Sequence, residues 1–262
     1  MRIFCVANQK GGVGKTTTTV NLAAGLARIG QRVLVVDLDP QGNATMGSGI
    51  DKRALSLTVY DVLLESASIP EARQHSAKVG YDVLGANREL AGAEVDLVGL
   101  ERRDRRLKTA LEAVAADYDF VLVDCPPSLS LLTLNGLCCA HGVVVPMQCE
   151  YFALEGLSDL VNTIRQVHAN LNPDLQLIGL LRVMFDPRIT LQQQVSEQLK
   201  AHFAEKVFNT VIPRNVRLAE APSYGLPGVV FDPSSRGAQA FVEFAKEMVE
   251  RVASPAPAAA TV

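Results

Sequence analysis

The feature that most constrains this chain is a glycine-rich loop between a short apolar run and a helix-like segment. The loop reads GGVGKTT over residues 11–17 and follows the strand-like run RIFCVAN at 2–8. Glycines let backbone N–H groups turn toward an anion without a Cβ in the way. The positive end of the helix predicted over 16–29 points to the same place. The order of strand, loop and helix therefore predicts a phosphate-binding loop.

The polar residues of this loop match the chemistry of a nucleoside triphosphate. We expect Lys15 to neutralise the β- and γ-phosphates and the Thr16 hydroxyl to ligate Mg²⁺. The strict motif would require glycine at position 9, where this chain has Gln9. A second lysine, Lys10, lies just ahead of the glycines, although one lysine normally suffices for one triphosphate. The phosphate-binding residues predicted from the loop are Gly11, Gly12, Val13, Gly14, Lys15, Thr16 and Thr17.

Acidic residues end two other strand-like runs. The run DFVLVDCP at 119–126 supplies Asp124, and the run RVLVVDLD at 32–39 supplies Asp37 and Asp39. In a chain with a phosphate-binding loop, an aspartate at the end of a strand is expected to hold Mg²⁺ through water, and we assign this role to Asp124. Either Asp37 or Asp39 could orient the attacking water, and the residues alone do not choose between them.

Short β-rich runs alternate along the chain with longer helical patterns, which is typical of βα units around a parallel sheet. Several runs are apolar at every position, as expected for strands covered on both faces. We therefore predict an α/β fold, a mostly parallel twisted sheet with helices on both faces. The predicted strands are 2–8, 32–39, 81–86, 119–126, 142–148 and 177–185. The predicted helices are 16–29, 105–116, 154–170, 191–203 and 235–252.

The length of 262 residues and the 48% apolar content suit one large domain, which we place at 1–252. The Pro/Ala-rich segment 253–262 is predicted to be a disordered tail. Five cysteines without a C-x-x-C pair indicate reduced core residues in a cytosolic protein. No apolar run reaches the roughly 18–20 residues of a membrane span, so we expect no membrane partner. The net charge of −3 gives no global sign of nucleic-acid binding.

Four motifs, found in this order, resemble those of the ParA/Soj chromosome-partition ATPases of the MinD/ParA deviant-Walker-A superfamily. They are KGGVGKTT, VDLDPQGN, VLVDCPPS and VIPRNVRLAEAPSYG, and the resemblance runs from about residue 2 to residue 251. It implies a P-loop NTPase (deviant Walker A) fold that hydrolyses ATP with Mg²⁺. Lys10 matches the family's signature lysine, which implies that it reaches across an ATP-sandwich homodimer to the partner's phosphates. Asp39 matches the residue that positions the water, and Pro213 and Asn215 match the segment that packs on adenine.

A basic stretch between 182 and 217 bears on partners. Six cations face three carboxylates there, in a chain of net charge −3, which by itself only permits DNA binding. The resemblance implies that Arg188 and Arg217 hold non-specific double-stranded DNA through its phosphates. It also implies a ParB-type centromere-binding partner that stimulates hydrolysis, and a cytoplasmic, nucleoid-associated protein. The cations of the stretch are Arg182, Arg188, Lys200, Lys206, Arg214 and Arg217.

Three other classes of function use the same kind of loop. A MinD-like ATPase that switches on a membrane would need a C-terminal amphipathic basic helix, whereas this sequence ends in SPAPAAATV. A reductase of the nitrogenase iron-protein type needs two glycine-flanked cysteines, and Cys125 has no such second cysteine. A kinase or small-molecule synthetase on the same loop stays open. The charge run LERRDRRLKTAL at 100–111, which contains Arg102–Arg106, receives no role.

Overall fold

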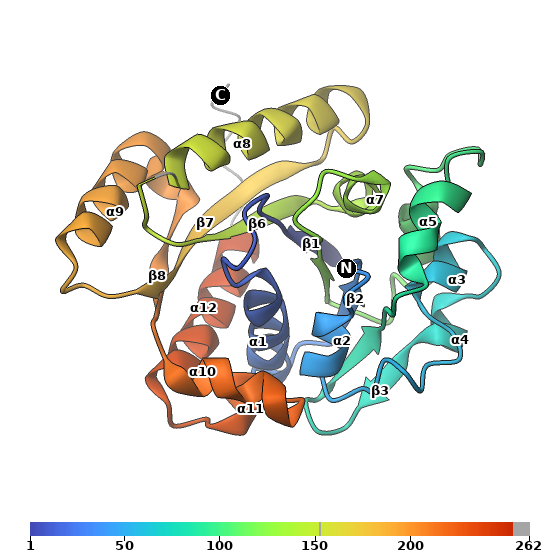
Figure 1. Cartoon of the computed structure of the whole chain (residues 1–262), viewed down its shortest axis with the longest axis horizontal. Coiled ribbons are helices and arrows are strands. Elements are labelled where there is room, and N and C mark those ends of the chain that lie inside the picture. The colour runs from blue at the N-terminus through green and yellow to red at the C-terminus, as the bar shows by residue number, and fades with distance from the viewer. Residues whose placement is uncertain (152, 254–262) are drawn as a thin grey trace.

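The computed structural model describes residues 1–151 and 153–253, and the strands among them form one eight-stranded sheet in the order β3-β4-β2-β5-β1-β6-β7-β8 (Figure 1). Neighbouring strands are parallel except for the antiparallel pair β3 and β4 at one edge. The predicted fold class is confirmed. The strands are β1 (Arg2–Val6), β2 (Val33–Asp37), β3 (Gln74–Ser76), β4 (Tyr81–Leu84), β5 (Phe120–Asp124), β6 (Gly142–Met147), β7 (Gln176–Phe185) and β8 (Val207–Pro213).

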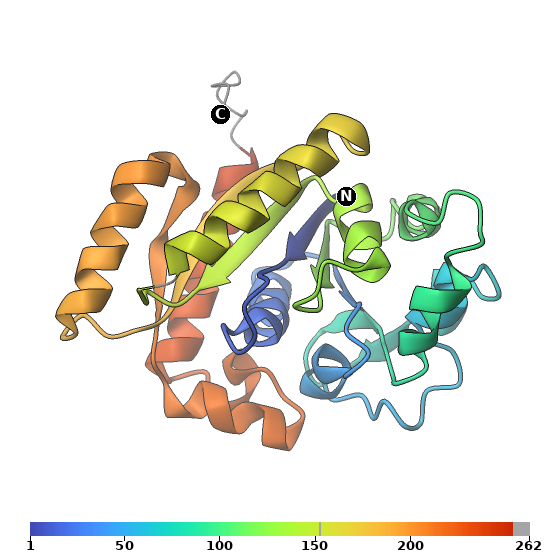
Figure 2. The same ribbon diagram turned by 45° about the horizontal axis from the view of Figure 1, so that its top comes forward.

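Helices cover both faces of the sheet. Figures 1 and 2 show α7 and α8 on one side and α1 and α12 on the other, and a buried apolar layer lies between the sheet and each set. The long helices are α1 (Lys15–Arg28), α8 (Ala153–Asn170), α9 (Thr190–Phe203) and α12 (Arg236–Ala253). The shorter ones are α2 (Asn43–Gly47), α3 (Val59–Leu63), α4 (Ile69–Ala72), α5 (Leu90–Asp96), α6 (Arg106–Glu112), α7 (Leu131–Cys139), η1 (Ala204–Lys206), α10 (Val216–Glu220), η2 (Ala221–Tyr224) and α11 (Gly228–Phe231).

All five predicted helices are present, each within a few residues of its expected bounds. The tail predicted over 253–262 lies outside the described residues except for Ala253, which ends α12. In the described part of the chain, no helix combines the length and apolar character needed to span a bilayer.

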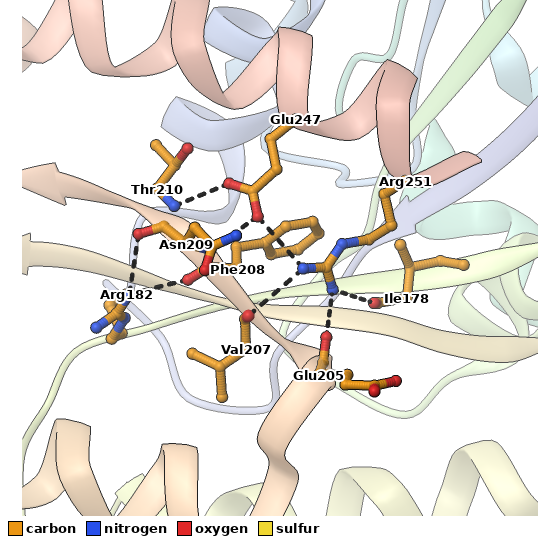
Figure 3. Close-up of polar contacts among 9 residues, drawn as sticks. All are labelled: Ile178, Arg182, Glu205, Val207, Phe208, Asn209, Thr210, Glu247 and Arg251. Carbon is orange, nitrogen blue, oxygen red and sulfur yellow. Dashed lines mark hydrogen bonds and ion pairs between the residues drawn. The ribbon is translucent and has the colours of Figure 1, made fainter. Parts of the chain in front are cut away.

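Two side chains compensate for an interruption in the β7–β8 ladder. Strand register jumps from Leu180↔Val207 to Arg182↔Val211, so backbone groups of β8 between these pairs lack strand partners. Figure 3 shows how they are satisfied. Arg182 donates to the carbonyls of Phe208 and Asn209 at 2.8 and 3.1 Å. Glu247 of α12 accepts the N–H groups of Asn209 and Thr210 at 2.7 and 2.8 Å.

Arg251, one turn after Glu247 on α12, also contacts the β8 edge of the sheet. Its guanidinium lies 4.1 Å from the ring centre of Phe208, and it also donates to Glu247 at 3.3 Å. It donates in addition to the backbone carbonyls of Ile178, Glu205 and Val207 (Figure 3). α12 thus holds the edge strand through polar contacts as well as through its apolar face.

Candidate functional site

The glycine loop lies at the carboxyl end of β1, between strands β5 and β6 in the middle of the sheet. Gly12 and Gly14 have φ angles of 73° and 80°, in the left-handed region that side chains disfavour. A Cβ added at Gly11 or Gly12 would meet nothing within 4 Å, so this side of the loop is open. Val13 is buried and offers a ligand only its backbone. The loop therefore fits a group bound by backbone N–H donors at the start of α1.

The two lysines of the loop lie in different environments. Lys15 is 9% exposed, and its Nζ donates to the carbonyl of Lys10 at 3.2 Å. Burial lowers the pKa of Lys15, and the nearby carboxylate of Asp124 acts in the opposite direction. The Lys10 side chain is 48% exposed, and its Nζ lies 2.6 Å from Glu150 Oε2. Lys15 is thus buried within the loop, whereas Lys10 is half-exposed and paired with Glu150.

Sequence reasoning missed three polar residues that contact the loop or Lys10, namely Asn8, Gln148 and Glu150. Asn8 accepts from the backbone of Lys10 at 3.0 Å and donates to the Pro146 carbonyl at 2.9 Å. Gln148 donates to the Gly12 carbonyl at 3.2 Å. Glu150, Gln148 and Pro146 all belong to the end of β6 or follow it. A usable signal exists, because polar residues after an apolar strand gather at the same edge as the glycine loop.

Asp124 joins β5 to the first turn of α1. Its two carboxylate oxygens lie 2.8 Å from the Thr16 hydroxyl and 2.9 Å from the Thr19 hydroxyl. Burial is the largest cause that raises the pKa of Asp124, to about 7, and the charge of Asp37 adds to it. Hydroxyl and carboxylate oxygens are the donors that Mg²⁺ prefers, so the pair predicted for the metal is brought together and fits that ion.

Asp37 and Asp39 lie in different environments. Asp37 is fully buried, and its oxygens accept from the backbone and hydroxyl of Thr45 at 2.9 and 2.7 Å and from the backbone of Asp39 at 3.1 Å. Asp39 is half-buried, and one of its oxygens accepts from the backbone of Gln41 at 2.9 Å. Asp37 is engaged in holding the turn after β2, and Asp39 is the carboxylate accessible at the edge of the site.

The two residues expected at adenine lie at the end of β8 and just after it. Pro213 ends the strand, and the Asn215 side chain caps α10 by accepting from the backbones of Arg217 and Leu218 at 2.9 and 3.3 Å. A cavity of about 290 Å³ lies between α1, α2 and α10 and includes Thr17 and Leu218, but not Pro213 or Asn215, in its wall. The segment after β8 therefore lies beside the start of α1.

The predicted DNA arginines follow two neighbouring strands, but one member of the basic stretch, Arg182, is buried and not on the surface. Phe185 pairs with Pro213, which brings the residues after β7 beside those after β8. Arg188 is 88% exposed and Arg217 is 55% exposed. Arg182 is only 4% exposed, because it is needed for the β8 carbonyls and for Ser196, 2.9 Å away. Arg182 adds nothing to a surface patch.

Comparisons with known proteins agree with this geometry. A family model described as an AAA domain matches residues 1–177. The sporulation initiation inhibitor protein Soj of Bacillus subtilis is 53% identical over 94% of this chain and 98% of its own. The chromosome partitioning protein ParA of Caulobacter vibrioides is 47% identical over 96% of this chain and 95% of its own. A solved structure with bound ADP and magnesium, described as cobyrinic acid a,c-diamide synthase from Mycobacterium smegmatis, superposes with a TM-score of 0.86 at 40% identity, covering 97% of this chain and 96% of that one.

The two relatives named for partitioning or sporulation control match almost from end to end. In this chain the loop, the aspartates and the arginines follow the carboxyl ends of strands of one sheet. This chain is a member of the ParA/Soj family of P-loop chromosome-partitioning ATPases.

Proposed function

We propose that this protein is a DNA-partitioning ATPase whose hydrolysis is tied to pairing of two copies. The observation that carries the proposal is the contrast between its two loop lysines. Lys15 is buried in the loop, whereas Lys10 is half-exposed and contacts Glu150 outside it. A half-exposed cation that is not buried in its own loop can be reached by phosphates of a second copy, where charge develops during phosphoryl transfer.

In this proposal the residues of one chain hold MgATP. The backbone of Gly11–Thr17 and the Lys15 side chain bind the phosphates, and Pro213 and Asn215 lie at the adenine. Thr16 holds Mg²⁺ directly and Asp124 holds it through water, and the ion neutralises phosphate charge. Asp39 orients the attacking water, which is consistent with its accessible carboxylate. Asp37 has no share in the reaction because its oxygens are engaged in the turn after β2.

The cellular cycle follows from the family. ATP closes a homodimer, the dimer binds double-stranded DNA without sequence preference through Arg188 and Arg217, and a ParB-type centromere-binding partner stimulates hydrolysis and release. The protein is then cytoplasmic and associated with the nucleoid. A small-molecule synthetase is the second candidate, because the Mycobacterium smegmatis structure carries that description. Partitioning is favoured because the Soj and ParA relatives are more identical to this chain.

Co-sedimentation with a random-sequence duplex in ATP, in ADP and without nucleotide tests the proposal. We expect binding in ATP that falls steeply with salt, because only phosphates are contacted. Arg188→Glu and Arg217→Glu should each weaken binding and leave ATP-dependent dimerisation intact. Arg165→Glu, at an exposed arginine on α8, is the matched control and should change binding little. A strong preference for one duplex, or equal effects of all three reversals, would overturn the DNA role of this surface.

A further inference from the structure

Both arginines assigned to DNA are held by carboxylates of their own chain. Arg188 makes a two-pronged contact with Asp186, in which Nε lies 2.9 Å from Oδ1 and Nη2 lies 2.7 Å from Oδ2. Arg217 is shared between Glu220, 2.9 Å from Nη1, and Asp232, 3.4 Å from Nε. A carboxylate and a phosphate present the same kind of paired oxygen acceptors to a guanidinium. The chain therefore already occupies the groups that DNA would use.

We propose that Asp186 and Asp232 compete with DNA phosphates for Arg188 and Arg217 and so set the DNA affinity of this protein. The inference rests on the proposed DNA-binding function. It adds carboxylates as determinants of affinity, whereas that function assigns a role only to the arginines.

Asp186 and Asp232 are also held by contacts that do not involve the arginine side chains. The Asp186 backbone donates to the Gln192 side chain at 2.7 Å, and Asp186 Oδ1 also accepts from the Arg188 backbone at 3.0 Å. Asp232 accepts from the backbone and hydroxyl of Ser234 at 3.2 and 2.7 Å. A phosphate that takes either arginine must therefore displace an anchored anion and remain close to it.

The carboxylates are ionised at any physiological pH. The hydrogen bonds and charge of Arg188 lower the pKa of Asp186 to about 2. The hydrogen bonds of Ser234 lower the pKa of Asp232, and Arg217 contributes. Arg214 is a further cation whose charge reaches Asp186. Asp186, Glu220 and Asp232 thus lie against Arg188 and Arg217 and offset their charge.

The test measures affinity for a fluorescent random-sequence duplex by anisotropy, with ATP, in wild type, Asp186→Asn and Asp232→Asn. Asparagine keeps the size of the side chain and an oxygen for the local backbone contacts, so the loops should fold normally. We expect each variant to bind about two- to fivefold more tightly, the range that the loss of an exposed ion pair gives. The gain should shrink as salt rises, because exposed charges are screened. Glu197→Gln, at an exposed carboxylate of α9, makes the same change in net charge and should gain less.

A double-substitution cycle separates competition from simple repulsion. In an Arg188→Gln background, Asp186→Asn should gain clearly less than in wild type, because no arginine remains to be freed. An equal gain in both backgrounds would overturn the inference, as would Asp186→Asn and Asp232→Asn variants that bind no better than Glu197→Gln. Failure of wild type to bind DNA with any nucleotide would instead contradict the proposed function itself, so the two failures are distinguishable.

Discussion

Asp37 and Asp124 are paired in register on the adjacent parallel strands β2 and β5, and both are buried at the end of their strand. Burial raises the pKa of Asp37 to about 6 and that of Asp124 to about 7, and the charge of Asp37 further raises the pKa of Asp124. Threonine hydroxyls stabilise the charged form of each carboxylate, Thr45 for Asp37 and Thr16 for Asp124. The two aspartates at the edge of the sheet that is proposed to hold Mg²⁺ therefore take up protons near neutral pH.

This pair makes the stability of the protein depend on pH in a specific direction. An unfolded aspartate has a pKa of about 3.9, so between roughly pH 4 and 7 the folded chain binds a proton at Asp124 that the unfolded chain has released. The free energy of unfolding therefore decreases as pH rises through this window. Asp124→Asn lacks the effect and should gain stability relative to wild type between pH 5 and pH 8.

Urea denaturation without nucleotide or Mg²⁺ checks this at both pH values. Asp119→Asn is the control, because Arg32 lowers the pKa of Asp119 to about 2, outside the window. Its difference from wild type should be the same at pH 5 and pH 8. Parallel profiles for Asp124→Asn and wild type would contradict the buried-pair argument.

The two loop lysines should separate nucleotide binding from turnover. Lys15→Ala removes the buried cation and should abolish tight MgATP binding. Lys10→Ala should keep ATP affinity within about threefold, which corresponds to about 0.7 kcal/mol, and lose about 10²–10³-fold in partner-stimulated turnover. Binding of a fluorescent ATP analogue and phosphate release measure the two quantities. An equal loss of ATP affinity in both variants would remove the distinction.

The sequence was sufficient for the centre of the sheet but not for its edges. Strands β1, β2, β5 and β6 are apolar because helices cover both faces, and this signal is strong. The edge strand β3 (Gln74–Ser76) has three residues without an apolar pattern, and β8 (Val207–Pro213) interrupts its apolar residues with Asn209 and Thr210. Polar side chains are tolerated there because Asn209 is exposed and Thr210 is only partly buried. Glu247 accepts their backbone N–H groups from 38 and 37 residues away in sequence.

Site residues could be proposed from the sequence where they belong to a recognisable motif. Two contacts could not be predicted in this way. The contact of Glu150 with Lys10 depends on how two separate loops meet, and the contact of Asp186 with Arg188 depends on how one loop turns. Arg182 was misplaced for the same reason, since composition counts a charge without its burial. The residues alone did not choose between Asp37 and Asp39; the family resemblance favoured Asp39, and the contacts of Thr45 with Asp37 are seen only in the structure.

Glu247 offers a test of how α12 stabilises the edge of the sheet. Its side chain is 14% exposed, and Glu247→Ala would leave the N–H groups of Asn209 and Thr210 without their acceptor. We expect a loss of about 1–3 kcal/mol in the free energy of unfolding. Glu243→Ala, one turn earlier on α12, removes only an exposed pair with Lys246 and should change stability by less than about 0.5 kcal/mol. Similar losses for the two variants in urea denaturation would show that the backbone contacts contribute little.

Asp39 and Asp37 should give opposite phenotypes although they are two residues apart. Asp39→Ala removes a half-buried carboxylate that accepts from the backbone of Gln41, so the fold and the glycine loop should be unaffected. If Asp39 orients the attacking water, turnover should fall by about 10²–10⁴-fold, even with the ParB-type partner. ATP would still bind, Lys10 would still reach the partner chain, and the dimer would persist because it could not reopen by hydrolysis.

Size-exclusion chromatography with ATP measures whether the Asp39→Ala dimer persists, and Asp37→Ala is the comparison variant. Asp37 is buried and accepts from Thr45 and from the Asp39 backbone, so its removal leaves buried donors unpaired and should destabilise the chain. We expect Asp39→Ala to elute as an ATP-dependent dimer with wild-type stability, and Asp37→Ala to unfold at lower urea. A monomeric Asp39→Ala protein in saturating ATP would mean that Asp39 builds the nucleotide site or the interface, and that the water is positioned by another group.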